Sequence, residues 1–405
     1  MRSGRISDEQ KRSDVKKKER KNNPIFCIGD KEDPRGAVDV RFLLYTLVTI
    51  LFGCLMNYSA SAVYAEQMYG DSTYFLVRYL LFAVISIAVT AFFVRRATMT
   101  FWYAFAKWIY IAAIAMLLLV LVIGTVGGGA QRWLRIGPIT IQPSEVAKLA
   151  VVMMLARYLS DHRDGVTSLK KGGGSFLHGV AIPFAIIGTI CGLVALEKHI
   201  SGLMIIGMIG ITVMFAGGTR MRFLGLIVLA VALAGCGLIA VSSYAQTRVH
   251  TWLHIDTVDP LGEAWQTLQG LYAIGSGGVF GVGLFNSRQK YGYVSQPQND
   301  FVFTVICEEL GFFGALLVLL LFGLIVVRGV KIALRSPNRF CALVIVGLVA
   351  KLAIQVILNL AVVTNSMPNT GISLPFFSSG GTSLALQIFE MGIILNLSRY
   401  SRLNQ

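Results

Sequence analysis

The chain is dominated by long, nearly uninterrupted runs of apolar residues that alternate with shorter polar segments. Several of these runs are about twenty residues long, the length that an α-helix needs to cross roughly 30 Å of hydrocarbon. The pattern therefore predicts an all-α, polytopic integral membrane protein. We expect about ten transmembrane helices, over residues 42–62, 74–94, 103–124, 144–160, 177–196, 201–218, 223–243, 301–327, 340–363 and 382–398.

The composition supports this class of protein. Of the 405 residues, 55% are hydrophobic and only 14% are charged, and the mean hydropathy is +0.66, whereas soluble domains carry about a quarter charged residues. These values exclude an ordinary soluble enzyme, a disordered protein and a small disulfide-bonded scaffold. The six cysteines show no metal-ligand spacing and lie mostly in apolar runs, so we interpret them as core thiols.

Positive charge is concentrated at the N-terminus and on one side of the predicted helices. Residues 1–41 hold 12 of the 36 Lys and Arg residues, and we expect them to form a disordered cytoplasmic tail without a signal peptide. Such a tail touches anionic lipid rather than nucleic acid. With the N-terminus inside, the tail and the cytoplasmic connections carry 25 Lys and Arg residues and the outer connections carry 6. The positive-inside rule then makes both termini cytoplasmic.

Three outer segments are long and rich in Gly, Pro and aromatic residues: 125–143, 244–300 and 364–381. The second is a large extracytoplasmic loop between the seventh and eighth helices. Loops of this length are usually functional or disordered, and the tryptophans in two of them favour irregular backbone ordered at the membrane surface. We therefore expect the function to face outward, from a membrane domain that covers residues 42–400.

Some charges lie where a bilayer tolerates them poorly. Lys351 is near the middle of the ninth predicted helix, and Gln355 and Asn359 continue a polar stripe from it toward the outer face. Glu390, on the antiparallel tenth helix, is the expected partner of Lys351. Such a pair either fixes helix packing or takes part directly in substrate handling. Lys148 follows three residues after an acid at the outer end of the fourth helix, where we expect both to reach water.

Asp300 stands immediately before the apolar run of the eighth helix. It is either an N-cap, for which Asp is favoured, or a catalytic acid at the outer boundary of the membrane. Glu308 lies about 80° further around an ideal helix and is expected to face the same groove, whereas Glu309 points nearly opposite. The stretch before Asp300 is rich in Gly and amides and contains Arg288 and Lys290. It supplies ingredients for holding a phosphate beside a carboxylate.

Long motifs carry a resemblance to a known family. They are GGGAQRWLRIGPITIQPSEVAKL at 127–149, EKHISG at 197–202, GVGLFNSRQKYGYVSQPQNDFVFTVICEELGFFG at 281–314 and NLAVVTNSMPNTGISLPFFSSGGTSL at 359–384. The chain resembles the SEDS family of peptidoglycan glycosyltransferases, of the FtsW, RodA and SpoVE type, and looks closer to the division and sporulation branch. It departs from the family where SQPQNDF replaces a segment like PEAHTDF and FFSSGGTS replaces FISYGGSS.

The resemblance implies polymerisation of lipid II at the outer face of the bacterial cytoplasmic membrane, with undecaprenyl pyrophosphate as the leaving group. The essential acid of the family corresponds to Asp300, as general base toward the acceptor hydroxyl. A class B penicillin-binding protein is the implied partner, besides other cell-wall or divisome membrane proteins. A divalent cation, Mg²⁺ or Mn²⁺, is a possibility, and DTVD at 256–259 is not a convincing motif for its ligands. The expected substrate-binding residues are Arg132, Lys148, Arg248, Lys290, Gln298 and Glu308.

Two other functions remain open at this point. A lipid II flippase or transporter would use the intramembrane polar residues as a transit path. A non-catalytic scaffold of a cell-wall complex would use the outer loops only for docking. Polymer formation from lipid II, and its response to Asp300→Asn, distinguishes these from an enzyme, since fold alone does not determine function.

Overall fold

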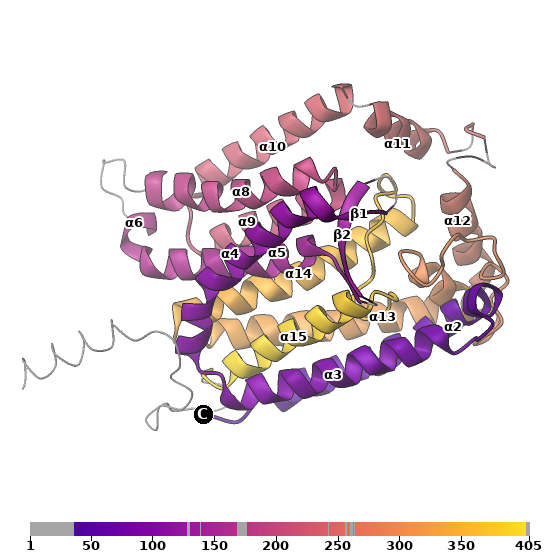
Figure 1. The fold of residues 1–405 in the computed structure, drawn as a ribbon, viewed down its shortest axis with the longest axis horizontal. Coiled ribbons are helices and arrows are strands. Elements are labelled where there is room, and N and C mark those ends of the chain that lie inside the picture. The colour runs from indigo at the N-terminus through magenta and orange to yellow at the C-terminus, as the bar shows by residue number, and fades with distance from the viewer. Residues whose placement is uncertain are drawn as a thin grey trace, which may run out of the picture.

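The computed structural model describes residues 36–401, except 128–129, 138, 168–175, 242, 256, 260–261 and 263. Most of the predicted basic tail, residues 1–35, lies outside the described residues. The helices run broadly along one common direction, and a small sheet lies at one end of them (Figure 1). We call this end, which also holds α11 and α12, the sheet end of the molecule.

The described helices are α2 (Val40–Tyr69), α3 (Tyr74–Arg96), α4 (Met99–Ile123), α5 (Pro143–Asp161), α6 (Arg163–Thr167), η1 (Leu177–Ala181), α8 (Ile182–Leu196), α9 (Ile200–Ala216), α10 (Met221–Val241), α11 (Ser243–Leu253), α12 (Trp265–Gly277), α13 (Val302–Leu334), α14 (Arg339–Val363) and α15 (Gly381–Ser398). Strands β1 (Thr125–Gly127), β2 (Ala130–Ile136) and β3 (Ile139–Ile141) form an antiparallel sheet in that order.

Each of the ten ranges predicted as transmembrane overlaps one of these helices. Within the described residues, seven helices are long and apolar enough to cross a membrane, namely α2, α3, α4, η1 with α8, α13, α14 and α15. Helix α9 and the segment Met221–Ala230 of α10 are apolar but shorter. The chain is thus a multi-pass, all-helical membrane protein apart from its small sheet, and the number of ten spans stays a prediction.

Helix α5 is the most polar of the predicted spans and lies at the centre of the bundle. It contacts α4, α8, α9 and α14, and 13 of its 19 residues are buried, among them Glu145 and Lys148. A charged side chain is tolerated at membrane depth where protein rather than lipid surrounds it. The surrounding helices turn apolar side chains outward instead, as Leu51 and Val84 show at 70% and 65% exposure.

The start of α2 is tied to the ends of α13 and α15 at the end of the bundle opposite the sheet. Asp39 caps α2 by accepting a hydrogen bond from the Phe42 amide at 2.9 Å. Its carboxylate also pairs with Arg328 near the end of α13, at 2.6 Å. The Asp39 amide donates to Ser398 at the end of α15. These contacts fix the start of α2 against the ends of two other helices.

The outer segments are more regular than their composition suggested. Residues 125–143 form a β-hairpin and a third strand rather than irregular backbone, and residues 244–300 contain most of α11 and all of α12. The expectation of irregular backbone was therefore wrong for the strands of the first segment and for α11 and α12 of the second, whereas residues 278–300 do lack helix and strand. The segment between α14 and α15 does lack helix and strand.

Helix α12 packs along α13 where α13 is broken. Gly311 has φ of +64° inside α13, a left-handed conformation that glycine adopts without strain. The segment after α12 takes up the hydrogen bonds that the break frees: the amides of Val282 and Gly283 donate to the carbonyls of Glu308 and Glu309, at 2.9 and 3.0 Å. Polar backbone in such a break has to be satisfied by protein, which explains the close fit of this loop to α13.

Candidate active site

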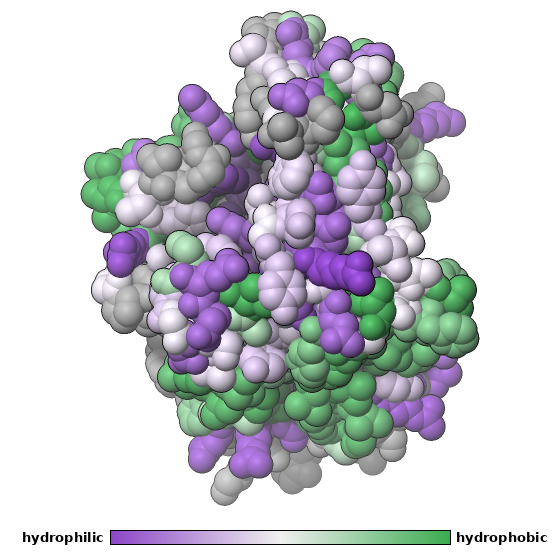
Figure 2. Space-filling model, turned by 90° about the vertical axis from the view of Figure 1, so that its right-hand side faces the viewer, coloured by the Kyte–Doolittle hydropathy of each residue, from purple (hydrophilic) through white to green (hydrophobic). Residues whose placement is uncertain are grey.

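A cavity of about 860 Å³ opens at the sheet end of the bundle. Its walls come from β2 and β3, the first turns of α5 and α9, helix α11, the turn before α13 and the segment between α14 and α15. Figure 2 faces this end of the molecule and shows hydrophilic side chains across its middle above a broad hydrophobic area. Asp300, Arg132, Lys148 and Arg248 all line the cavity, so the structure brings these predicted residues together.

Asp300 is not the N-cap of α13. The cap position is Phe301, and no side chain caps the helix there, so that alternative was wrong. Asp300 instead belongs to a turn whose carbonyls are held one after another. The Ser379 amide donates to the Gln298 carbonyl at 2.9 Å, the Ser378 hydroxyl to the Asn299 carbonyl at 2.6 Å, and the Asn359 side-chain amide to the Asp300 carbonyl at 2.9 Å. The backbone of Asp300 is therefore fixed while its carboxylate faces the cavity.

The surroundings of Asp300 suit a base that works near neutral pH. Burial raises the pKa of its carboxyl to about 6, and the positive charge of Arg132 acts in the opposite direction. Gly371 lies close to this carboxylate: a Cβ atom at Gly371 would stand 3.1 Å from Asp300 Oδ2, and its φ of +66° favours glycine. The backbone of the segment between α14 and α15 thus forms a wall beside the carboxylate.

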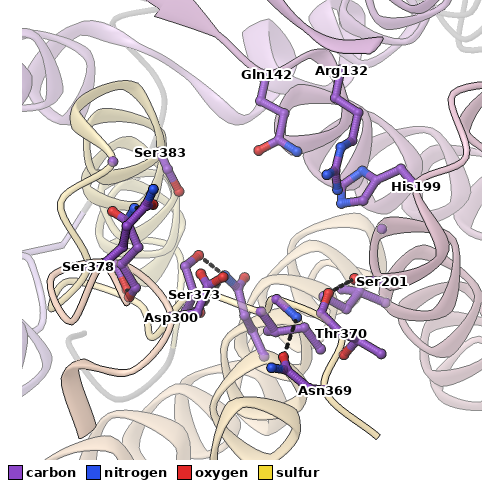
Figure 3. Close-up of a pocket in the computed structure, with 18 of the residues that line it drawn as sticks. Arg132, Gln142, His199, Ser201, Asp300, Asn369, Thr370, Ser373, Ser378 and Ser383 are labelled. Atoms are coloured by element: carbon purple, nitrogen blue, oxygen red, sulfur yellow. Dashed lines mark hydrogen bonds between the residues drawn. The ribbon is translucent and has the colours of Figure 1, made fainter. Parts of the chain in front are cut away.

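Cationic groups lie on two other sides of the cavity. Figure 3 shows Arg132, Gln142 and His199 across the cavity from Asp300. Lys148 follows on α5 and is paired with Glu145 at 2.6 Å. Arg248, on α11, donates a hydrogen bond to the carbonyl of Asn369. These groups provide positive charge where an anionic leaving group would develop.

His199, Ser201 and Gly202 of EKHISG line the cavity, and Glu197 lies close enough to feel the charge of Arg132, although sequence reasoning gave none of them a role. Burial, together with the charges of Arg132 and Lys148, lowers the pKa of His199 to about 4, so its imidazole is neutral at pH 7. Burial raises the pKa of Glu197 to about 7, against the charge of Arg132. Both carboxylate oxygens of Glu197 lack a hydrogen-bond partner among the described residues. Only the order of polar residues in this short motif pointed to them.

A buried chain of opposite charges continues from the floor of the cavity. Glu145 lies between Lys148 at 2.6 Å and Lys351 at 3.9 Å, and Lys351 in turn lies 2.5 Å from Glu390. Lys351 and Glu390 are each only 2% exposed. Lys148 is also 2% exposed. It and Glu145 both line the cavity from within the protein, so their expected access to water leads through this cavity.

The polar stripe on α14 holds the cavity wall in place. Gln355 donates to the carbonyl of Ser373 at 3.2 Å. Asn359 donates to the carbonyl of Ile372 at 2.6 Å in addition to its bond with Asp300. The stripe therefore binds backbone of the segment between α14 and α15.

Three predicted substrate contacts do not line the cavity. Lys290 is buried and pairs with Glu309 at 2.9 Å. Glu308 does not face the same groove as Asp300, because its carboxylate accepts hydrogen bonds from the Ser287 hydroxyl and the Arg288 amide, at 2.5 and 2.9 Å. The side chain of Gln298 is 2% exposed, and its carbonyl supports the turn before α13. Lys290 and Glu308 thus fasten the loop to α13, and Gln298 holds the turn before α13 to Ser379, contacts that spacing along the chain does not reveal.

The cavity offers no preformed set of metal ligands in the part of the chain that the structure describes. No group of three or more His, Cys, Asp or Glu side chains is found there. Of the acids lining the cavity, Glu145 is already engaged by two lysines. The expected divalent cation therefore stays a prediction.

Comparisons with known proteins agree with this architecture. The family model FTSW_RODA_SPOVE, described as "Cell cycle protein", matches residues 40–403. The chain is 40% identical over 370 residues to "Stage V sporulation protein E" of Bacillus subtilis (strain 168), covering 90% of this chain and 98% of the relative. It is 34% identical over 373 residues to "Probable peptidoglycan glycosyltransferase FtsW" of Trichlorobacter lovleyi, covering 89% and 93%.

Solved structures show the same fold. A structure described as "Structural coordination of polymerization and crosslinking by a peptidoglycan synthase complex" contains a chain that matches with a TM-score of 0.73 and 27% identity, over 90% of this chain and 98% of that one. The rod shape determining protein RodA of Thermus thermophilus matches with a TM-score of 0.66 and 25% identity, over 90% and 98%. The extent of these matches, and motifs that converge on one cavity, show that the chain belongs to the FtsW/RodA/SpoVE family of membrane proteins.

Proposed function

We propose that this protein is a peptidoglycan glycosyltransferase that polymerises lipid II, with Asp300 as the general base. One observation carries the proposal: a fixed carboxylate whose pKa burial raises to about 6 faces a cavity of about 860 Å³ that also presents Arg132, Lys148 and Arg248. Relatives named as probable peptidoglycan glycosyltransferases support the enzyme class.

The reaction uses the two sides of the cavity differently. The Asp300 carboxylate takes the proton from the acceptor 4-hydroxyl as that oxygen attacks the anomeric carbon of the donor sugar. The bond from that carbon to the pyrophosphate oxygen breaks, and undecaprenyl pyrophosphate leaves with the electron pair. Arg132, Lys148 and Arg248 stabilise the negative charge that develops on the leaving group.

The orientation of the protein in the membrane and its partner protein belong to the same proposal. The excess of Lys and Arg on one set of connections supports ten spans with both termini cytoplasmic and the cavity open to the outside. A structural neighbour described as a peptidoglycan synthase complex supports a class B penicillin-binding protein as partner. The likeness to a stage V sporulation protein supports a role in sporulation or division.

The buried charges support an enzyme rather than a transporter. Lys351 and Glu390 are paired with each other and almost fully buried, so they are better suited to fixing α14 against α15 than to lining a transit path.

The test is polymerisation of lipid II in detergent by the purified protein, with and without a class B penicillin-binding protein. We expect glycan strands from the wild type and none above background from Asp300→Asn. Polymer made equally by Asp300→Asn would remove the assigned base. Transfer of lipid II across vesicles without polymer would identify a flippase, and full complementation in cells by Asp300→Asn would identify a scaffold.

A further inference from the structure

A second, mostly apolar groove of about 370 Å³ adjoins the active-site cavity. We call it the α3–α15 groove. Ile85 and Val89 of α3, Val146 of α5, and Ala385, Leu386 and Phe389 of α15 supply its apolar walls. Ile85 and Val89 are 54% and 45% exposed, so the groove is open at the surface that an apolar helix turns toward lipid.

The α3–α15 groove and the cavity meet at a polar rim. Gln142, Glu145, Thr382 and Ser383 line both spaces. A molecule that extends from one space into the other therefore passes from cationic and hydroxyl side chains to mostly apolar ones within one contiguous site. This change of polarity matches an amphiphile with an anionic head and a hydrocarbon chain.

We propose that the α3–α15 groove binds the polyprenyl chain of the donor substrate while its pyrophosphate lies at the polar rim. The assignment rests on the proposed function, because that function supplies a pyrophosphate linked to a polyprenyl chain.

The groove opens on the side of the cavity that suits a donor. Strand β3, which carries Ile141 at the groove, pairs with β2, the strand that holds Arg132. Lys148 stands one helical turn beyond Glu145 on α5. Figure 3 shows Asp300 across the cavity from Gln142 and Arg132, on the same side as the rim residue Ser383. A pyrophosphate at the Gln142–Glu145 edge of the rim thus lies next to the cations, and the Asp300 side stays open to the acceptor hydroxyl and its base.

The course of the groove agrees with the membrane. It follows α15 from Thr382 to Phe389, eight residues whose ends are about 10 Å apart along a helix axis. A chain in this groove runs along the helix into the hydrocarbon region and stays in contact with lipid at the exposed side chains of α3. The chain consequently does not have to enter the polar cavity.

Chain-length dependence tests the groove in the polymerising protein. Ile85→Trp narrows the groove at its exposed edge, and Leu81→Trp is the matched control, since Leu81 lies one turn away on α3, is 53% exposed and does not line the groove. We expect Ile85→Trp to raise KM about tenfold or more for lipid II with a 55-carbon chain. It should leave KM unchanged for an analogue with a 10-carbon chain, and the control should change neither. An equal effect on both substrates, or no effect, overturns the proposal.

Crosslinking separates this proposal from the function on which it rests. When photoreactive benzoylphenylalanine replaces Leu386, irradiation should crosslink the protein to radioactive undecaprenyl pyrophosphate. Unlabelled undecaprenyl pyrophosphate should reduce this crosslinking, whereas phosphatidylglycerol should not. Equal competition by phosphatidylglycerol shows an ordinary lipid contact and overturns the groove assignment. Specific labelling in a protein that makes no polymer supports the groove and contradicts the proposed catalysis. Polymer without chain-length discrimination or specific labelling contradicts the groove alone.

Discussion

The pH dependence of polymerisation tests the assigned role of Asp300 most directly. A general base works only when ionised, and burial raises the pKa of Asp300 to about 6. The rate should therefore fall about tenfold for each pH unit below 6. At pH 5 about a tenth of this carboxyl is ionised, whereas a carboxyl at the ordinary value of 3.8 would still be more than about nine-tenths ionised.

Changing Arg132 shifts the acid limb of the pH–rate profile, the range in which the rate falls as the pH is lowered, in a predictable direction. The positive charge of Arg132 lowers the pKa of Asp300 against the effect of burial, so Arg132→Gln should shift the limb to higher pH. The same variant should also slow the reaction, because Arg132 lines the cavity and stabilises the leaving group. The midpoint of the limb, with each variant normalised to its own plateau, isolates the electrostatic effect from the loss of rate.

The assay is the initial rate of glycan formation from lipid II in detergent between pH 4.5 and 8.5. Thermal denaturation at each pH excludes unfolding as the cause of a decline. Glu197→Gln serves as the control, since burial raises the pKa of Glu197 to about 7 and its removal should leave a limb near pH 6. A limb near pH 4, or a limb that stays in place or moves downward in Arg132→Gln, refutes the reasoning.

Three other predictions concern stability and positioning. Asp300→Asn should be more stable than wild type at pH 7.5 by up to about 3 kcal/mol, since a carboxyl pKa raised by about two units disfavours the ionised folded form. The gain should vanish below about pH 4, where the carboxyl is protonated in both the folded and the unfolded state. Equal thermal denaturation of the two proteins at pH 7.5 would contradict this prediction. Lys351→Met should destabilise the protein by about 3–5 kcal/mol, because Glu390 is left buried without its 2.5 Å partner. A double variant that also carries Glu390→Leu should recover much of the lost stability. Thermal denaturation measures both, and equal midpoints for the single and the double variant would contradict the prediction. Asn359→Leu and Ser378→Ala should each lower kcat about 10- to 100-fold with little change in KM, because each removes a hydrogen bond that holds the backbone of the turn carrying Asp300. Ser378→Thr keeps the hydroxyl and should retain the wild-type rate. An effect on KM alone would argue against a positioning role.

The sequence sufficed for the long apolar helices, because such helices are encoded locally, but not for α11 and α12. Each apolar run of about twenty residues predicts a helix without knowledge of its neighbours, and all ten predicted ranges overlap observed helices. Asp300 was also found from the sequence, since it adjoins an apolar run and falls in a motif shared with a known family.

The contents of the cavity depended on contacts between distant segments. Lys290 and Glu308 have the chemistry of substrate ligands. Their charged groups are instead engaged in an ion pair and a hydrogen bond between α13 and the segment after α12. His199 lines the cavity, and Glu197 feels the charge of Arg132, only because the connection between α8 and α9 lies near β2 and α5. No periodicity along the chain reports such packing.

What the sequence predicts and what only the tertiary structure shows therefore differ for a physical reason. The amino-acid sequence alone predicted which segments form apolar helices, because transfer of a helix into hydrocarbon depends on its own side chains. Only the tertiary structure decided which polar groups meet around Asp300 and which are spent on holding the loops. That outcome depends on hydrogen bonds and ion pairs between residues up to hundreds of positions apart.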